Sequence, residues 1–268
     1  MAFDPFQLHV PHASLDVVVT AAKHEDGPTV IRALNDPRVH LNLDQPPFPY
    51  TEADWESWFK HVKEINDRTR EEWQAMATSD EKRDVETSRS TRWIGSKGWG
   101  SMIRVRVAKS DASVFGNNSD RTEVMIGTID VRRSGFPGVV DRQEQAAAVA
   151  FNDSLPLGDP GIVWEVGYYL ISEYHGRGIM PATLQTLRSK VLVPLMNVHI
   201  LTGYYFEGND ASRRVFEKCG FQAQGMVPDA LVLPDSKARA SGNSIGMGIM
   251  RWTRAGDSQD EMDASQST

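Results

Sequence analysis

The sequence predicts a single α/β domain of about seven strands and about four helices. β-rich runs and amphipathic helical patterns alternate along most of the 268 residues. The β-rich run Val163 to Ile171 leads through a glycine turn, His175 to Gly178, into a helical pattern. With 40% hydrophobic and 24% charged residues, the chain has the composition of an ordinary soluble protein, and its length allows one core.

In the N-terminal half, a short β-rich run is followed by two helical patterns and a hairpin. The second helical pattern repeats Trp55, Phe59 and Val62 at helical spacing, and Thr51-Glu-Ala-Asp54 opens it like a capping box. Turn-forming residues after Ala108 predict that the next two strands form a hairpin. We expect strands at Leu15 to Ala22, Met102 to Ala108 and Glu123 to Arg132, and helices at Asp26 to Leu34 and Glu52 to Asn66.

In the C-terminal half, strands and helices alternate. The helix after the glycine turn carries Leu184, Leu187 and Val191 on one stripe. Asp210 can cap the last helix and Gly220 can end it. We expect helices at Met180 to Leu195 and between Asp210 and Gly220, and strands at Val163 to Ile171, His199 to Phe206, Gln222 to Val232 and Ile245 to Trp252.

The expected domain runs from residue 15 to residue 254. Residues 1–14 are expected to be an N-terminal extension, and inserted loops are expected near 73–100 and 133–162. Residues 255–268 are polar and acidic and are predicted to form a disordered tail. The start of the chain lacks the features of a secretory signal, no apolar run approaches the ~18 residues of a membrane span, and Cys219 is the only cysteine. We therefore expect a cytoplasmic protein with no membrane partner.

Charge and histidine spacing exclude other classes of partner. The formal net charge of −7 argues against a nucleic-acid partner and mildly favours a cationic substrate. The seven histidines show no H-x-x-x-H spacing and have no cysteine partner, so no metal site is expected.

The glycine turn between strand and helix predicts an anion-binding site. Glycines let the backbone approach a phosphate, and the unpaired N–H groups of a helix N-terminus point toward it. Met180 and Pro181 follow where a dinucleotide-binding fingerprint needs a third glycine, and Ile179 follows Gly178 where a P-loop needs lysine. The nucleophile elbow G-x-S-x-G does not occur.

Two segments resemble the GNAT acetyltransferase superfamily. His175-Gly-Arg-Gly-Ile-Met180 is similar to its acyl-CoA pyrophosphate loop, Gln/Arg-x-x-Gly-x-Gly/Ala, with the central glycine kept and both ends changed. The segment from Asn209 to Phe221 looks like the N-x-x-[AS]-x-x-x-[YF]-E-K-x-G-F block that follows the fifth strand of the superfamily. Glu-Val-Gly-Tyr168 and Ser212 are similar to the branch of ribosomal-protein N-acetyltransferases. The strong part of the resemblance covers residues 163 to 254.

The resemblance implies a GNAT fold, with a mixed, strongly twisted sheet, and acetyl-CoA as the acyl donor. It also implies that the strand Val163 to Ile171 splays from the next strand and pairs its backbone with pantetheine. The residues expected to contact acetyl-CoA are Tyr169, Leu170, Ile171, His175, Gly176, Arg177, Gly178, Ile179, Met180, Asn209, Ser212 and Phe216.

Direct acetyl transfer needs a base for the amine and a proton for the leaving thiolate. Glu165 is the leading candidate for the base because a carboxylate inside an apolar strand is unusual; a solvent-facing or salt-bridged glutamate is the alternative, and Glu207 is the rival base. Many family members have Tyr where this chain has Phe216, so Ser212 is expected to present its hydroxyl to the sulfur. A serine that bonds back to a helix carbonyl is the alternative.

The expected function is therefore an N-acetyltransferase. It would move an acetyl group from acetyl-CoA to a primary amine, on a small molecule or a protein N-terminus, by direct transfer in a ternary complex. The alternative is a catalytically weak or inactive CoA-binding sensor or interaction protein of the same fold, which the missing tyrosine and Met180 support.

Overall fold

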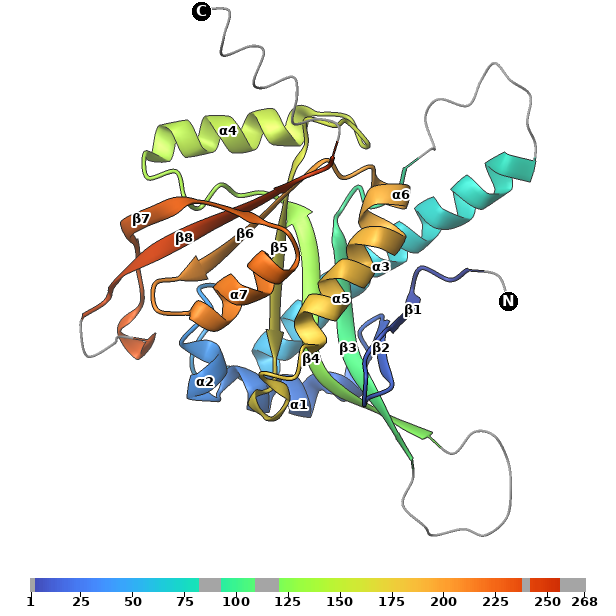
Figure 1. Cartoon of the computed structure of the whole chain (residues 1–268), viewed down its shortest axis with the longest axis horizontal. Helices are drawn as coiled ribbons and strands as arrows, with labels where there is room; N and C mark the ends of the chain where they lie inside the picture. The colour runs from blue at the N-terminus through green and yellow to red at the C-terminus, as the bar shows by residue number, and fades with distance from the viewer. Residues whose placement is uncertain (1–2, 82–92, 109–120, 238–241, 256–268) are drawn as a thin grey trace, which may run out of the picture.

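The computed structural model describes residues 3–81, 93–108, 121–237 and 242–255 of the chain. An eight-stranded sheet in the order β1-β2-β3-β4-β5-β6-β8-β7 forms the centre (Figure 1). All neighbouring strands are antiparallel except β5 and β6, which are parallel. The α/β class is thus confirmed. The strands are β1 Gln7–Val10, β2 Val17–Thr20, β3 Trp99–Ala108, β4 Arg121–Arg133, β5 Val163–Leu170, β6 Ile200–Phe206, β7 Gln222–Val232 and β8 Ser244–Thr253.

Helices cover both faces of this sheet. In Figure 1, α5, α6 and α7 lie in front of the sheet and α1, α2 and α3 lie behind it, whereas α4 packs near its upper edge. A π-helical turn at Arg188–Leu192 joins α5 to α6 in one continuous ridge. The helices are α1 Gly27–Leu34, α2 Pro37–His40, α3 Glu52–Glu81, α4 Arg142–Ser154, α5 Ile179–Leu187, α6 Val193–Met196 and α7 Asp210–Lys218.

The main core lies between the sheet and the ridge of α5 and α6. Leu184, Leu187 and Val191, the predicted stripe, are fully buried there against Trp164 and Val166 of β5. Helix α3 begins with the predicted capping box, because Thr51 and Asp54 exchange hydrogen bonds. These local patterns therefore place each element against the sheet as expected.

Three elements differ from the sequence expectation. The supposed extension contains β1, whose Leu8 and Val10 are buried while Gln7 and His9 are exposed, so residues 7–10 belong to the sheet. Helix α3 continues into the expected loop as far as Glu81. The other expected loop contains α4, which Asp141 caps by accepting hydrogen bonds from two backbone N–H groups. Residues 82–92 and 256–268, in the first loop and the tail, lie outside the described residues.

A buried ion pair fixes the start of α1 to the sheet. Arg104 of β3 donates two hydrogen bonds of 2.7 Å to the carboxylate of Asp26, and both side chains are 2% exposed. Arg104 also donates to the hydroxyl of Thr20 at 2.7 Å. Each charge is therefore compensated, which burial requires.

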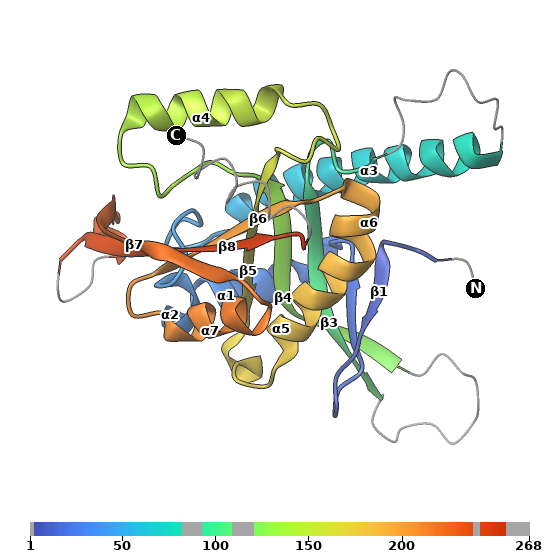
Figure 2. The same cartoon turned by 45° about the horizontal axis from the view of Figure 1, so that its top comes forward.

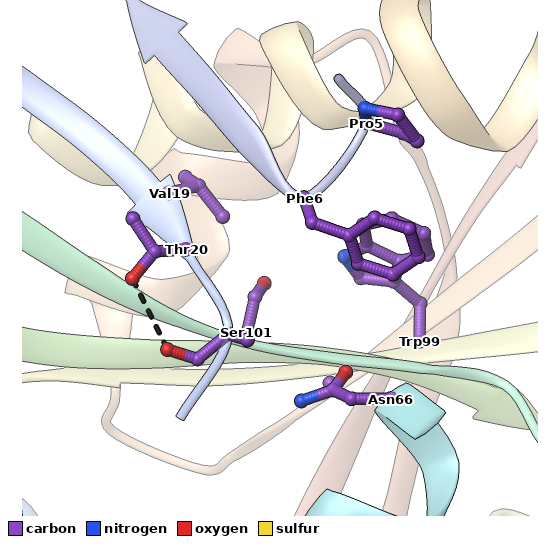
Figure 3. Close-up of a pocket in the computed structure, with 9 residues that line it drawn as sticks. Pro5, Phe6, Val19, Thr20, Asn66, Trp99 and Ser101 are labelled. Atoms are coloured by element: carbon purple, nitrogen blue, oxygen red, sulfur yellow. Dashed lines mark hydrogen bonds between the residues drawn. The ribbon is translucent and has the colours of Figure 1, made fainter. Parts of the chain in front are cut away.

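A small pocket with essentially no room for a water molecule lies where β1 and β2 meet β3 (Figure 3). Phe6 stacks on Trp99 at 5.2 Å between ring centres and fills much of the space. The pocket is therefore a packing gap, and the candidate site lies elsewhere, at β5 and β6.

Candidate active site

Strands β5 and β6 separate halfway along their length. They pair from Val163 to Val166 with Ile200 to Gly203, and then diverge (Figure 1). Beyond this point β5 and β6 no longer pair with each other. We call the separated parts, Gly167 to Leu170 and Tyr204 to Phe206, the splay, and we call the end where the two strands meet the apex. The splay that the resemblance implied is present. It leaves a strand edge whose backbone groups can pair with an extended ligand.

The backbone hydrogen bonds show which residues face the splay. The N–H of Ile171 donates to the carbonyl of Ile126 at 2.8 Å, so it faces β4. Alternate residues of a strand direct their backbone groups to opposite edges. Tyr169 therefore also faces β4, and Tyr168 and Leu170 face the splay. Of the three residues predicted to pair with pantetheine, only Leu170 is placed to do so, and Tyr168 joins it.

The glycine loop is open and exposes its backbone. Gly176 and Gly178 have φ of 73° and 78°, a left-handed region that favours glycine, and no atom lies within 4 Å of an added Cβ at either residue. Among the described residues, no acceptor binds the backbone N–H groups of Arg177, Gly178 or Ile179. The side chains of Ile179 and Met180 are buried, so these two residues offer only backbone to a phosphate.

Two histidines hold this loop. His12, from the segment between β1 and β2, donates from Nε2 to the carbonyl of Arg177 at 2.8 Å. Its Nδ1 accepts from the backbone N–H groups of Ser14 and Leu15, which sets the tautomer. His175 donates from Nε2 to the carbonyl of Leu170 at 2.8 Å. That nitrogen of His175 serves the strand end, so it is not available for a phosphate.

Helix α7 brings Ser212 to the splay. The side chain of Asn209 accepts a hydrogen bond from the N–H of Ser212 at 3.1 Å, so Asn209 caps the helix. The hydroxyl of Ser212 lies 2.9 Å from the hydroxyl of Tyr168. Phe216 is 1% exposed, and a Cβ on Gly203 would lie only 2.1 Å from its ring. Phe216 thus packs on β6, and its contact with the acyl donor remains a prediction.

Tyr168 is the hydroxyl that sequence reasoning missed. Burial raises the pKa of Tyr168, so its phenol is protonated at neutral pH and can donate a hydrogen bond. The ring packs on Phe216 at 5.4 Å between centres. A phenol on β5 thus lies beside the hydroxyl of Ser212 on α7. Finding this pair requires knowing that α7 covers this face of β5, which only the structure shows.

Glu165 lies on the opposite face of β5, near the apex, and is held by three donors. Its Oε1 is 2.6 Å from Nη2 of Arg132, and its Oε2 accepts from the hydroxyl of Ser134 at 3.3 Å and the N–H of Gly135 at 3.2 Å. The side chain is 8% exposed. The salt-bridged alternative therefore describes its environment, and its role as base remains a prediction.

Asp130 is a second carboxylate on that face, and the sequence did not single it out. It lies opposite Gly167 in the ladder between β4 and β5, and Arg132 donates to its Oδ2 at 2.9 Å. The side chain is 38% exposed. Desolvation by neighbouring protein raises the pKa of Asp130 to about 6, and the charge of Arg132 opposes the shift. Recognising Asp130 from sequence requires the register of the two strands.

Glu207 lies far from this cluster. It follows β6 at the open end of the splay, exposed, with its carboxylate beside Gly246 of β8. Thr202 is the partner of Glu165, and Glu207 lies five residue steps further along the chain, a distance of about 16 Å. The two predicted bases are therefore not brought together.

The remaining observations concern metals, membranes and cysteine. In the described ranges, no group of three His, Cys, Asp or Glu side chains is arranged to hold a metal ion. No described helix is both long enough and apolar enough to cross a membrane. Cys219 is buried, and burial raises the pKa of its thiol to about 11, so the thiol is unreactive at neutral pH.

The sequence model of the acetyltransferase (GNAT) domain matches residues 65–222, more than half of the 268-residue chain. The chain belongs to the GNAT acetyltransferase family. The predicted fold and enzyme class are thereby confirmed. No curated protein sequence matches the chain significantly.

Solved GNAT structures share this fold. The ribosomal-protein-S5-alanine acetyltransferase from Vibrio fischeri has a TM-score of 0.52 at 16% identity, over 93% of this chain and 97% of that one. The microcin C7 self-immunity acetyltransferase MccE, in complex with acetyl-CoA and AMP, has a TM-score of 0.50 at 12% identity, over 90% of this chain and 94% of that one. The ribosomal L7/L12 acetyltransferase RimL, in complex with coenzyme A, has a TM-score of 0.50 at 14% identity, over 92% of this chain and 98% of that one. Identities this low demonstrate the fold alone.

Proposed function

We propose that this GNAT protein transfers an acetyl group from acetyl-CoA directly to a primary amine within a ternary complex. The observation that carries the proposal is the arrangement along β5. The open glycine loop lies beyond one end of the splay, and the hydroxyl pair of Tyr168 and Ser212 lies near the apex. A phosphate site and a proton donor at opposite ends of an unpaired strand edge suit a long, extended thioester.

The residues that would hold acetyl-CoA fit its chemistry. The backbone N–H groups of Arg177, Gly178 and Ile179 suit its phosphates, and the N-terminus of α5 adds a favourable dipole. The backbone of Tyr168 and the N–H of Leu170 suit the amides of its pantetheine arm, whereas the carbonyl of Leu170 already accepts from His175. Gly176 and Met180 would complete the phosphate-binding loop with their backbone groups.

The chain's side chains would handle the two protons. Acetyl-CoA supplies an activated acyl group: a C–N bond forms to the amine while the C–S bond breaks. The amine proton passes to a carboxylate on the face of Asp130 and Glu165. The leaving thiolate receives a hydrogen bond or proton from the hydroxyls of Ser212 and Tyr168, which lie on the other face of β5. Donor and acceptor of protons are thus kept on opposite faces of β5.

We further propose a cationic acceptor, on a small molecule or a protein N-terminus, in the cytoplasm. The net charge of −7 and the two carboxylates at the apex support an ammonium substrate. Two of the similar structures are described as acting on ribosomal proteins and one as conferring self-immunity to microcin C7. At their low identity, these descriptions do not select an acceptor for this chain.

The test compares turnover with binding. Purified protein is given acetyl-CoA and a panel of primary amines, comprising short peptides with free N-termini, polyamines and amino sugars, and release of free CoA thiol is measured. Binding of acetyl-CoA is followed in parallel by thermal shift. Turnover with at least one amine supports the enzyme. Binding of acetyl-CoA without turnover of any amine in the panel would support the sensor. The missing helix tyrosine was an argument for the sensor, and the phenol of Tyr168 on β5 weakens this argument.

A further inference from the structure

We propose that Asp130 is the base that accepts the proton of the acceptor amine, and that Glu165 positions Arg132 beside it. The inference rests on the proposed acetyl transfer and assigns one of its steps. Both carboxylates lie on the same face of the sheet, because Asp130 pairs with Gly167 and Arg132 pairs with Glu165. Two differences between the carboxylates, in position and in hydrogen-bond capacity, decide between them.

The first difference is position along the splay. The last pair of β5 and β6 is Val166 with Gly203, so Gly167 is the first residue beyond the apex. Asp130 lies directly beside it: a Cβ added to Gly167 would be 3.1 Å from Oδ1 of Asp130. Glycine at this position therefore leaves room for the carboxylate at the place where β5 becomes unpaired. Glu165 lies two residues earlier in β5, where β5 and β6 still pair with each other.

The second difference is hydrogen-bond capacity. Both oxygens of Glu165 are occupied, Oε1 by Arg132 and Oε2 by Ser134 and Gly135. Asp130 accepts one hydrogen bond, on Oδ2 from Arg132, and its Oδ1 has no donor among the described residues. A base must reach the proton that it removes. Only Asp130 has an oxygen free for this contact, and its 38% exposed side chain is accessible to solute.

The basicity of Asp130 near neutral pH supports the same choice. A carboxylate with an ordinary pKa is a weak base toward an ammonium group, and a raised pKa improves it. Desolvation by neighbouring protein and the charge of Glu165 both raise the pKa of Asp130, and Arg132 lowers it. The other neighbour of β4, strand β3, presents Gly100 opposite Asp130, and the apolar Val62 of α3 lies over this glycine. Arg132 and Glu165 are therefore the charged groups that act on Asp130.

The proposed step balances as follows. The ammonium form of the acceptor loses one proton to Oδ1 of Asp130, and the neutral nitrogen forms the new C–N bond. As the C–S bond breaks, the nitrogen gives up a second proton to solvent, and the thiolate takes one proton from the hydroxyl pair of Ser212 and Tyr168, which solvent restores. Asp130 then returns its proton to solvent through its exposed side. Glu165 does not touch the amine; it holds Arg132 so that the guanidinium bridges both carboxylates at 2.9 Å and 2.6 Å.

The experiment compares Asp130→Asn and Glu165→Gln with the wild type across pH 5 to 9, using the best amine of the panel. Asp67→Asn, an exposed acid on α3, is the matched control. We expect Asp130→Asn to lower kcat about 100-fold, with acetyl-CoA affinity unchanged. Glu165→Gln is expected to retain most of kcat at high pH. The acid limb of its pH–rate profile should move to lower pH, because the negative charge of Glu165, which raises the pKa of Asp130, has been removed.

The outcomes separate this inference from the proposed function. Wild-type turnover together with an Asp130→Asn variant that retains its kcat at every pH would overturn the assignment and leave the enzyme in place. Loss of kcat only in Glu165→Gln would give the role to Glu165. A wild type without turnover on any amine would overturn the proposed function and this step with it.

A second measurement does not depend on activity. Carbon-13 NMR of aspartate carboxyl groups can follow the titration of Asp130, assigned by the loss of its signal in Asp130→Asn. We expect a midpoint near 6 in the wild type and a lower midpoint in Glu165→Gln. A midpoint at the ordinary aspartate value of about 4 would contradict the inference.

Discussion

Replacing Gly178 by glutamate tests the phosphate site most sharply. Gly178 is the N-cap of α5, with φ of 78°, and open space surrounds the position of an added Cβ. Glutamate therefore fits sterically, at a backbone strain of about 1–2 kcal/mol. Its negative charge would stand at the helix N-terminus, where the phosphates of acetyl-CoA are expected. Loss of one charge-assisted hydrogen bond, worth about 1.5–3 kcal/mol, would weaken acetyl-CoA binding roughly 10- to 100-fold.

Gly220→Glu provides the matched control, because Gly220 has φ of 80°, has equally open surroundings and lies at the end of α7, not at the N-terminus of α5. Both variants should lose about 2–8 °C in Tm from the same strain. Isothermal titration with acetyl-CoA should show the loss of affinity in Gly178→Glu alone. Equal affinity in both folded variants would refute the assignment of the loop.

Three further variants test other parts of the account. Tyr168→Phe should lower kcat about tenfold by removing one hydrogen-bond donor, with acetyl-CoA affinity unchanged, and steady-state kinetics with Ser212→Ala alongside would show whether the hydroxyls act together. His12→Ala should weaken acetyl-CoA binding about two- to tenfold without changing kcat, because the carbonyl of Arg177 loses its donor; a change confined to kcat would contradict this. Asp26→Ala should destabilise the fold by about 3–5 kcal/mol, because a buried guanidinium loses its partner, and thermal unfolding would measure the drop.

The sequence predicted best those features whose signals are local. The run of β5, the glycine turn and the start of α5 are contiguous, so their order alone indicates a phosphate site. The capping box at Thr51 depends on residues three apart. The start of α7 was predicted to within one residue, because the helix is capped by Asn209 and the predicted cap, Asp210, is its first residue. In each case a short segment contains all the groups that form the hydrogen bonds.

The features that the sequence did not predict depend on distant pairs. Tyr168 and Ser212 meet because α7 crosses the face of β5, and Asp130 meets Gly167 through strand register. β1 has only four residues, too few for its alternation to stand out, and its place in the sheet depends on pairing with β2. Helix α4 has many alanines and an almost wholly exposed surface, so it lacks the apolar stripe that marks a buried helix.

The position of bound coenzyme A tests the central claim most directly. A crystal structure of the complex should place the phosphates on the backbone of residues 176–180 and the pantetheine arm along the splay at Tyr168 and Leu170. The sulfur should lie within hydrogen-bonding distance of the hydroxyl of Ser212 or Tyr168. Coenzyme A bound elsewhere, or a splay that stays empty at saturating ligand, would contradict the account.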